Sequence, residues 1–294
     1  MISHFEKFFY SEKKSYLCAS KNYTMAKKKV LFITSEIFPY FPEGYISNIC
    51  RYLPQGIQER ENEIRTFMPK FGCVNEHRHM LHEVIRLSGQ NIIIEDTDHP
   101  LIIKVASLQN VRMQIYFIDS EDYFKRKTPY YDAEGVFYPD NDSRAIFYAK
   151  GVIETVRKLG WEPDIIHCHG WISHIVPAML KKVYKDDPIF YGSKVVLSLY
   201  DDTPKESFCA DFASKAGYGG LSPADLPFLE KPDGINLAKT AAQYSDGIIL
   251  GARNIEKDIL DYCKSLGLPM LEFKKESIEN GSYPDEYKAF YESI

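Results

Sequence analysis

The sequence has 294 residues, of which 45% are hydrophobic, and this is enough apolar material for one large α/β domain or two small ones. Its formal net charge is −5, from 36 basic and 41 acidic residues without a basic stripe, which disfavours a nucleic-acid or other polyanionic partner. The six cysteines form no CxxC pair, no apolar run approaches the ~20 residues that span a bilayer, and the N-terminus lacks a signal pattern. We therefore expect a cytoplasmic protein without a membrane segment.

Hydrophobic periodicity predicts a βαβ unit near the start of the chain. Residues 1–24 mix aromatic and charged side chains without a period, so we expect an N-terminal extension and leave open whether Met1 or Met25 is the start. Residues 30–34 form a nearly continuous apolar run, which is typical of a strand buried on both faces. Apolar residues at helical spacing predict a helix over 45–61, and residues 64–69 predict the next strand.

The middle of the chain changes pattern. Closely spaced strands are predicted over 83–87, 92–95, 101–106 and 111–118, as hairpins of an antiparallel insert or of a sheet extension. A helix with an apolar inner face is then predicted over 143–159.

A second α/β series completes the predicted domain. Its strands are expected over 165–168, 195–199 and 247–250, and its helices over 172–183, 234–244 and 254–266. This alternation predicts an α/β fold with a Rossmann-like, doubly wound, mostly parallel sheet and a small antiparallel hairpin insert. We expect this domain over 25–270, and a helical C-terminal tail over 271–294 that is packed on the domain or partly solvated.

An ordered series of segments resembles the N-terminal lobe of the bacterial glycogen and starch synthases, over residues 27 to 260. The segments are Ser35-Glu36-Ile37-Phe38-Pro39-Tyr40, Leu53-Pro54, Met68-Pro69-Lys70-Phe71-Gly72, Phe117-Ile118-Asp119, Tyr123-Phe124-Lys125-Arg126, Tyr138-Pro139-Asp140-Asn141 with Arg144, Pro163-Asp164-Ile165-Ile166-His167-Cys168-His169-Gly170-Trp171, and Gly234-Ile235-Asn236-Leu237-Ala238-Lys239 with Tyr244-Ser245-Asp246.

The resemblance implies a single N-terminal lobe of a GT-B fold, with the second lobe expected to be missing. It implies a retaining transferase that moves glucose from a nucleotide-diphosphate sugar to the end of an α-1,4-glucan. A separately encoded C-terminal lobe or a glycogen enzyme is then the expected protein partner, and we expect no cofactor and no metal.

The phosphate-facing signature of the family departs from its pattern here. Lys-x-Gly-Gly-Leu-Gly-Asp reads Pro42-Glu43-Gly44-Tyr45-Ile46-Ser47-Asn48, so the lysine and the second glycine are replaced and a carboxylate is added. Glycines and a helix N-terminus suit a diphosphate, whereas Glu43 would repel it. Gly44 and Asn48 remain candidate substrate-binding residues, although a helix start without a ligand explains them better.

His169 is the candidate catalytic residue, because it matches the family histidine that meets the transferred sugar and should lie at a strand end. Gly170 replaces the family aspartate and Ile172 replaces a second histidine. His167 is a candidate substrate-binding residue. A structural pair of His167 and His169, satisfied by backbone partners, is an equally good interpretation.

The remaining candidate substrate-binding residues each have an ordinary alternative. Tyr200 and Asp201 stand where the family has a Thr-x-His-Asn turn, and a solvated turn is favoured over acid/base chemistry or cation binding by Asp201-Asp202. Asp140 and Asn141 would contact a ligand or cap the next helix. Asn236 is carried by the resemblance alone.

A short histidine cluster, His77, His79 and His82, lacks the partners a metal would need.

These residues leave two functions open. The first is a glycosyltransferase domain of the glycogen and starch synthase type, nearly inactive as an isolated lobe. The second is a non-catalytic module that binds glucan or docks on a glycogen enzyme. A nucleotide-dependent oxidoreductase is disfavoured, because no GxGxxG follows the first strand.

Overall fold

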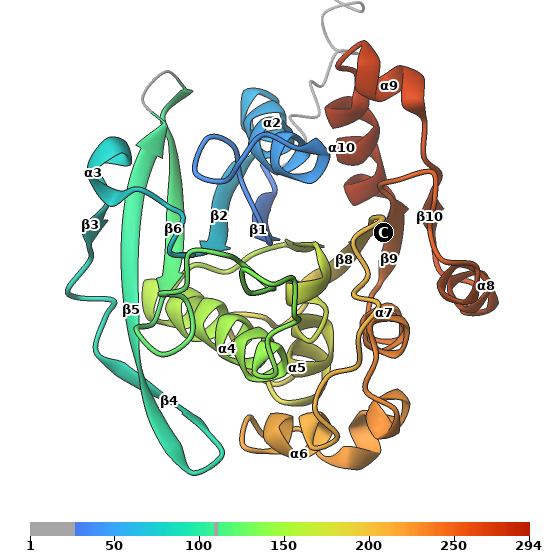
Figure 1. Cartoon of the computed structure of the whole chain (residues 1–294). Helices are drawn as coiled ribbons and strands as arrows, with labels where there is room; N and C mark the ends of the chain where they lie inside the picture. Colours follow the sequence, from blue (N-terminus) through green and yellow to red (C-terminus); the bar gives the residue numbers. More distant parts are fainter. Residues whose placement is uncertain (1–26, 109–110) are drawn as a thin grey trace, which may run out of the picture.

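The computed structural model describes residues 27–108 and 111–294, and the predicted extension over 1–24 lies outside the described residues. One sheet of 10 strands has the order β10-β9-β8-β7-β1-β2-β6-β5-β3, with β4 paired to β5 (Figure 1). The strands are β1 (Lys29–Thr34), β2 (Glu63–Pro69), β3 (His82–Glu83), β4 (Gln90–Ile94), β5 (Thr97–Leu108), β6 (Met113–Asp119), β7 (Ile165–His169), β8 (Lys194–Leu199), β9 (Gly247–Leu250) and β10 (Met270–Leu271).

The sheet is parallel from β10 to β6 and antiparallel beyond β6. β5 pairs antiparallel with β6, β3 and β4. The predicted doubly wound, mostly parallel sheet with a small antiparallel part is thus confirmed. Of the two arrangements left open, the strands over 80–119 extend the main sheet, and the β4–β5 hairpin projects from its edge (Figure 1).

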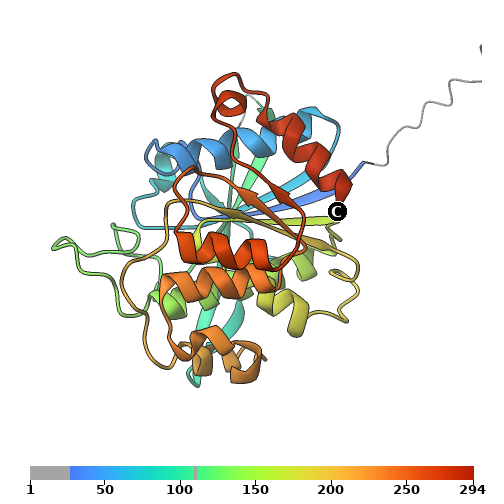
Figure 2. The same cartoon turned by 90° about the vertical axis from the view of Figure 1, so that its right-hand side faces the viewer.

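Helices cover both faces of the sheet (Figure 2). They are α2 (Tyr45–Glu59), α3 (Glu76–His79), α4 (Asn141–Leu159), α5 (Val176–Lys182), α6 (Phe212–Gly217), α7 (Gly234–Gln243), α8 (Lys257–Ser265), α9 (Lys275–Glu279) and α10 (Tyr283–Ser293), with single-turn 3-10 helices η2 (Trp171–Ser173), η3 (Pro223–Asp225) and η4 (Pro227–Glu230). No helix in the described ranges is long and apolar enough to cross a bilayer.

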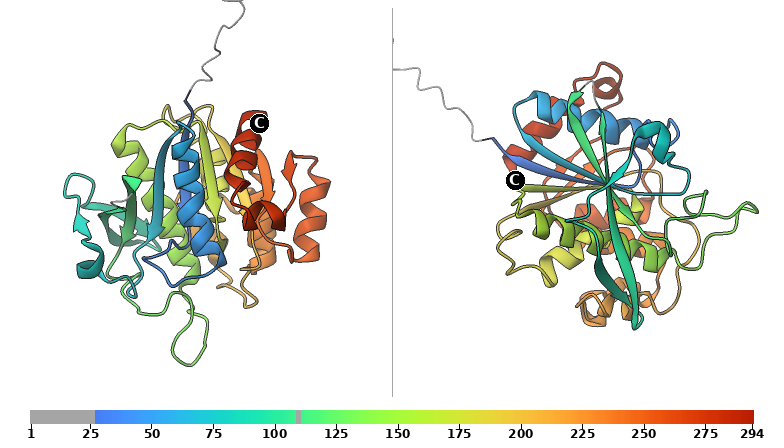
Figure 3. Two further views of the ribbon diagram at one scale, coloured as in Figure 1. Left: turned by 90° about the horizontal axis from the view of Figure 1, so that it is seen from above. Right: turned by 90° about the vertical axis from the view of Figure 1, so that its left-hand side faces the viewer.

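Alternate strand residues serve two separate cores, as the pleat requires. On β1, Leu31 and Ile33 pack in the core that includes α4, α5 and α7. Val30 and Phe32 point to the other face and pack in the core that includes α2 and α10. Figure 3 (left) shows α2 and α10 side by side on that second face.

Two predicted elements differ from the structure. The strand expected over 83–87 is limited to β3, because the chain turns after it, with Leu87 N–H donating to the carbonyl oxygen of Val84 at 2.9 Å. This turn buries Leu87, whose exposed fraction is 3%. The helix expected over 172–183 is divided into η2 and α5, and α5 begins where Pro177 occupies its first turn.

The stretch predicted as a C-terminal tail contains α9 and α10, and α10 contributes to the second core. Tyr287 and Tyr291 are buried against the sheet and α2, with exposed fractions of 5% and 2%. The packing gives α10 a part in the candidate site described next.

Candidate functional site

The strand order places a topological switch point between β1 and β7. From β1 the chain proceeds through β2 and β6 to one side, and from β7 it proceeds through β8 and β9 to the other. Ligands of doubly wound sheets bind beyond the carboxyl ends of the strands at such a point. Thr34 and His169 pair in register at these ends, and Ser35 N–H donates to the carbonyl oxygen of His169 at 2.9 Å.

His167 and His169 lie side by side on the α2 and α10 face, with ring centroids 3.8 Å apart and no solvent exposure. The Nδ1 of His169 lies 2.7 Å from the hydroxyl oxygen of Tyr200. His167 lies 2.7 Å from the hydroxyls of both Tyr291 and Ser198, through Nδ1 and Nε2 respectively. Side-chain hydroxyls therefore hold the pair, and the backbone partners that the structural interpretation expected are not the ones observed.

Burial keeps both histidines neutral. It lowers the pKa of His169 to about 3, and it lowers the pKa of His167 well below its usual value, with a further contribution from His169. Among the described residues, Nε2 of His169 has no hydrogen-bond partner. A sugar contact through this atom requires the covering side chains to move, so the catalytic role of His169 stays a prediction.

Two partly buried carboxyl groups, Glu36 and Asp202, lie at the carboxyl ends of β1 and β8. Burial raises the pKa of Glu36 to about 7, and the nearby charge of Asp202 raises it further within that total. The Ser47 amide, which donates to the carboxylate, acts in the opposite direction and lowers this pKa. Burial also raises the pKa of Asp202 to about 6. The sequence interpretation had placed Asp202 in a solvated turn, but its Oδ2 accepts a hydrogen bond from Trp171 N–H at 2.9 Å.

Asp202 lies where a side chain at position 170 would project. Gly170 has φ +80°, and a Cβ built on it would overlap Ser35 and lie 3.2 Å from Oδ2 of Asp202. A larger residue at 170 would therefore be strained and crowded. The resemblance implies an aspartate at position 170. The carboxyl group of Asp202, which follows β8, lies close to where that side chain would be.

The start of α2 is closed by its own residues. Gly44 is the N-cap, and its N–H donates to the Ser47 hydroxyl at 2.8 Å. The Tyr45 hydroxyl donates to the carbonyl oxygen of Gly251 at 2.6 Å, and its ring lies 6.2 Å from the ring of Tyr200. Asn48 is partly exposed on the next turn, 3.4 Å from Glu43.

Asp140 is the N-cap residue of α4, as one of the two interpretations expects, but its side chain makes no capping hydrogen bond. Asp140 accepts from Arg126 at 2.6 Å. Asn141 donates to the carbonyl oxygen of Tyr130 at 2.9 Å and accepts from Arg144 at 2.7 Å. Both side chains therefore fix the preceding loop against α4.

That loop carries Tyr130 to the carboxyl edge. Its ring packs on Trp171, with centroids 4.7 Å apart, and its hydroxyl is buried without a hydrogen-bond partner among the described residues. Burial, followed by the charge of Glu36, raises the pKa of Tyr130 well above its usual value.

The structure therefore brings some of the predicted residues together and leaves others apart. His169 is hydrogen-bonded to Tyr200, and the ring of His167 lies against that of His169. The ring contact between Tyr45 and Tyr200 connects this cluster to the start of α2. Asp201 is exposed beside it. Asn236 donates to the carbonyl oxygen of Lys231 at 2.9 Å, within its own turn.

Sequence reasoning missed Glu36, Tyr130 and the inward position of Asp202. Glu36 carried a usable signal, since it is an acidic residue directly after a predicted central strand.

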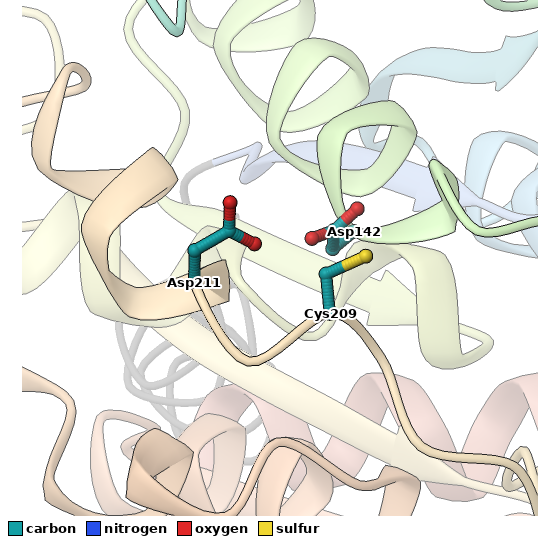
Figure 4. Close-up of side chains that lie close together, drawn as sticks. All are labelled: Asp142, Cys209 and Asp211. Atoms are coloured by element: carbon teal, nitrogen blue, oxygen red, sulfur yellow. The ribbon is translucent and has the colours of Figure 1, made fainter.

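A possible cation site among the described residues combines Asp142, Cys209 and Asp211 (Figure 4). Lys215 already occupies this group, with its Nζ 3.0 Å from Asp142 and 3.2 Å from Asp211. The ammonium supplies the positive charge, so the cluster is explained as a partly buried ion-pair network.

Comparison with known proteins agrees with this geometry. The protein-family model described as the starch synthase catalytic domain matches residues 29–270. The glycogen synthase of Chlorobium luteolum is 37% identical over 174 residues, which are 59% of this chain and 36% of that protein. The glycogen synthase of Chlorobaculum parvum is 31% identical over 243 residues, which are 82% of this chain and 48% of that protein.

The fold has a solved counterpart in the catalytic domain of starch synthase IV from Arabidopsis thaliana, bound to ADP and acarbose. The TM-score is 0.63 at 18% identity, over 76% of this chain and 45% of that chain. The present chain thus spans about half or less of the length of the relatives it matches. With the family match covering the whole sheet and the switch point, the chain belongs to the starch synthase catalytic domain family.

Proposed function

We propose that this chain is a glycosyltransferase domain of the glycogen and starch synthase type that, by itself, transfers glucose at most very slowly. In the proposed reaction class, the bond from the glucosyl anomeric carbon to the diphosphate breaks and a bond to a hydroxyl oxygen of an α-1,4-glucan forms. The nucleoside diphosphate departs and the hydroxyl proton is released. Nucleotide-diphosphate glucose and α-glucan are the proposed ligands, and the cytoplasm is the proposed compartment.

The observation that carries the proposal of low activity is the chemistry at the start of α2. Pro42 stands in place of the family lysine, and Glu36 accepts from the amide of Ser47, which a phosphate would otherwise use. Glu43 adds a further carboxylate on the same turn. A diphosphate would meet negative charge where the family signature presents a lysine and glycine amides.

The size of this effect is set by the charge on the departing diphosphate. Loss of one preorganised stabilising group costs about 10²- to 10³-fold in rate. The resemblance implies further basic contacts from a second lobe. Adding such a lobe should then raise the rate more than any change of acceptor.

A transfer assay tests the proposal. Purified protein with ADP-glucose or UDP-glucose and glycogen should give no detectable incorporation of glucose, because the departing diphosphate is not stabilised. The same assay with an active glycogen synthase controls for the acceptor. A turnover of ~1 s⁻¹ or more, which is within the ordinary range of enzymes, would overturn the proposal of low activity.

The closed start of α2 also favours a second candidate, a non-catalytic module that binds glucan or docks on a glycogen enzyme. Its glucan-binding form predicts that maltooligosaccharides bind around Asn48 and His169. Asn48 is partly exposed and His169 is fully buried, so a contact with Asn48 needs the smaller rearrangement. Retained glucan binding without transfer would support this candidate, and a lack of any glucan binding would leave only the docking role.

A further inference from the structure

One side of α2 carries a stripe of polar and aromatic residues that faces a groove. Tyr45, Asn48, Tyr52, Gln55 and Glu59 recur at the spacing that places residues on one side of a helix. They line a groove of about 690 Å³, whose opposite wall is the turn between α9 and α10 and the start of α10. This volume is within the range of small-molecule sites, roughly 300–1,000 Å³.

Close packing of α2 and α10 makes the groove a fixed feature. A Cβ built on Gly56 would lie 2.7 Å from Cβ of Pro284, so the two helices touch there. The Arg60 guanidinium donates to Asp285 at 2.6 Å, at the far end of the groove. The helices meet at these points, and the groove lies alongside their contact.

The lining suits a neutral ligand rich in hydroxyl groups. Tyr45 and Tyr52 are 42% and 48% exposed, so their rings offer rigid, amphipathic contact area. Arg51 lies over the Tyr52 ring, 5.2 Å from its centroid, and the Tyr45 hydroxyl is anchored on Gly251. The Gln55 amide accepts from Arg51 at 2.8 Å and donates to Glu59 at 2.7 Å, and the Asn48 amide donates to Glu43 at 3.4 Å. Each amide keeps a second N–H and a free lone pair on its oxygen for a ligand.

The charge of the lining excludes an anionic ligand. Its basic residue, Arg60, is already paired with Asp285, whereas Glu59 and Glu279 also face the groove. A phosphate or a polyanion would find no uncommitted cation among the lining residues.

We propose that this groove binds a neutral α-glucan chain that lies along α2, with the chain packed on Tyr45 and Tyr52 and hydrogen-bonded by Asn48 and Gln55. The identity of the sugar rests on the proposed function, and the location rests on the groove. Tyr45 stands where the resemblance implies a glycine, so the aromatic end of this groove departs from the family pattern. The same ring packs on Tyr200, which places the end of the groove beside the switch point.

Calorimetric titration of the full chain with maltoheptaose tests this location. Tyr52→Ala and Gln55→Ala should each weaken binding about fivefold to tenfold, and Tyr52→Phe should leave it within about twofold, because the ring persists. Tyr191→Ala is the matched control, since Tyr191 is 80% exposed and lies outside this groove, and it should bind like the unaltered protein. Cellohexaose, a β-1,4-linked glucan, should bind at least fivefold more weakly.

The outcomes separate the groove from the proposed function. If maltoheptaose binds Tyr52→Ala and Gln55→Ala as tightly as the unaltered protein, the groove is not the glucan site, although the protein still recognises glucan. No binding of maltoheptaose or glycogen by the unaltered protein would overturn both. Tight binding of ADP that competes with maltoheptaose would overturn the assignment to a neutral ligand. Thermal unfolding of each variant checks that it is folded, and Gln55→Ala removes a partly buried side chain whose hydrogen bonds go to Arg51 and Glu59 of the same helix.

Discussion

At the carboxyl edge of the sheet, polar groups that could contact a ligand instead form hydrogen bonds within the chain. The hydroxyls of Tyr200, Tyr291 and Ser198 hold the two histidines, and the Ser47 amide holds Glu36. Each of these contacts uses a group that a sugar or phosphate could otherwise have used. The edge of the sheet is therefore stabilised from within the chain.

Glu36→Gln tests this at the residue scale. The pKa of Glu36 is raised to about 7 in the folded protein, from 4.5, so its favourable contribution is present below pH 4.5 and is lost as the pH rises through 7. The variant should match the unaltered protein at pH 4.5 and have a free energy of unfolding about 1–2 kcal/mol higher at pH 8. Urea unfolding at both pH values measures this.

A gain of the same size at both pH values would contradict the assigned cause, because it would not depend on ionisation. Glu43→Gln is the control, since it removes an exposed carboxylate on the neighbouring turn and should change the free energy of unfolding by less than about 0.5 kcal/mol.

At the scale of elements, the contact between α2 and α10 decides the shape of the second core. Gly56 is buried within α2, and Pro284 is the second residue of α10. Glycine is ordinarily a poor residue inside a helix, costing roughly 0.5–1 kcal/mol relative to alanine. Here the close approach of Pro284 explains it.

Gly56→Ala should therefore destabilise the protein, although the same change stabilises an ordinary helix. The added methyl group would overlap Pro284 and force α10 away, at a cost of about 1–3 kcal/mol that exceeds the gain in helix propensity. Thermal unfolding measures the sign. Gly56→Ala should cost less in a Pro284→Gly background, because glycine lacks both the Cβ and the Cγ that the methyl group would meet. A single Gly56→Ala variant more stable than the unaltered protein would show that the two helices are not in close contact.

At the scale of the whole molecule, the described residues include three fully buried histidines, His167, His169 and His174, which favour neutral pH. Burial lowers the pKa values of His169 and His174 to about 3, and of His167 well below 6.5. A depressed pKa gives stability that is present above the unfolded value, 6.5, and is lost as the pH falls toward 3. Both ring nitrogens of His174 lack hydrogen-bond partners among the described residues.

The midpoint temperature of thermal unfolding should accordingly decrease when the pH is lowered from 7 to 5. His174→Leu should reduce this fall and raise stability at pH 5 by about 1–3 kcal/mol, because an unpaired buried polar group is replaced by an apolar one. Scanning calorimetry at the two pH values measures both effects. Equal pH dependence in the variant and the unaltered protein would remove His174 from the explanation.

Most of the fold could be predicted from the sequence because the central strands are short, largely apolar runs. The run over 30–34 is apolar on both faces and the runs over 64–69 and 165–168 are largely apolar, and the structure has β1, β2 and β7 there. The failure over 83–87 came from a turn that buries an apolar residue, which periodicity does not distinguish from a strand. The division at residues 270 and 271 stays a prediction.

The candidate site was predictable only in part. Motif order led to His169, and the structure places it at the switch point. Its side chain is buried beside Tyr200 and beside His167, and His167 in turn contacts Tyr291 of α10, which is 124 residues away in the sequence. Local patterns carry no information on such distant pairs.

The sequence by itself determined the family, the layered α/β architecture and the loss of the phosphate signature, because each is written in apolar periodicity or in short consecutive motifs. Only the tertiary structure decided which carboxyl groups turn inward, which hydroxyls hold the histidines, and that α2 and α10 enclose a groove. These features depend on contacts between strands and helices far apart in the chain, where burial and hydrogen bonding are fixed by packing.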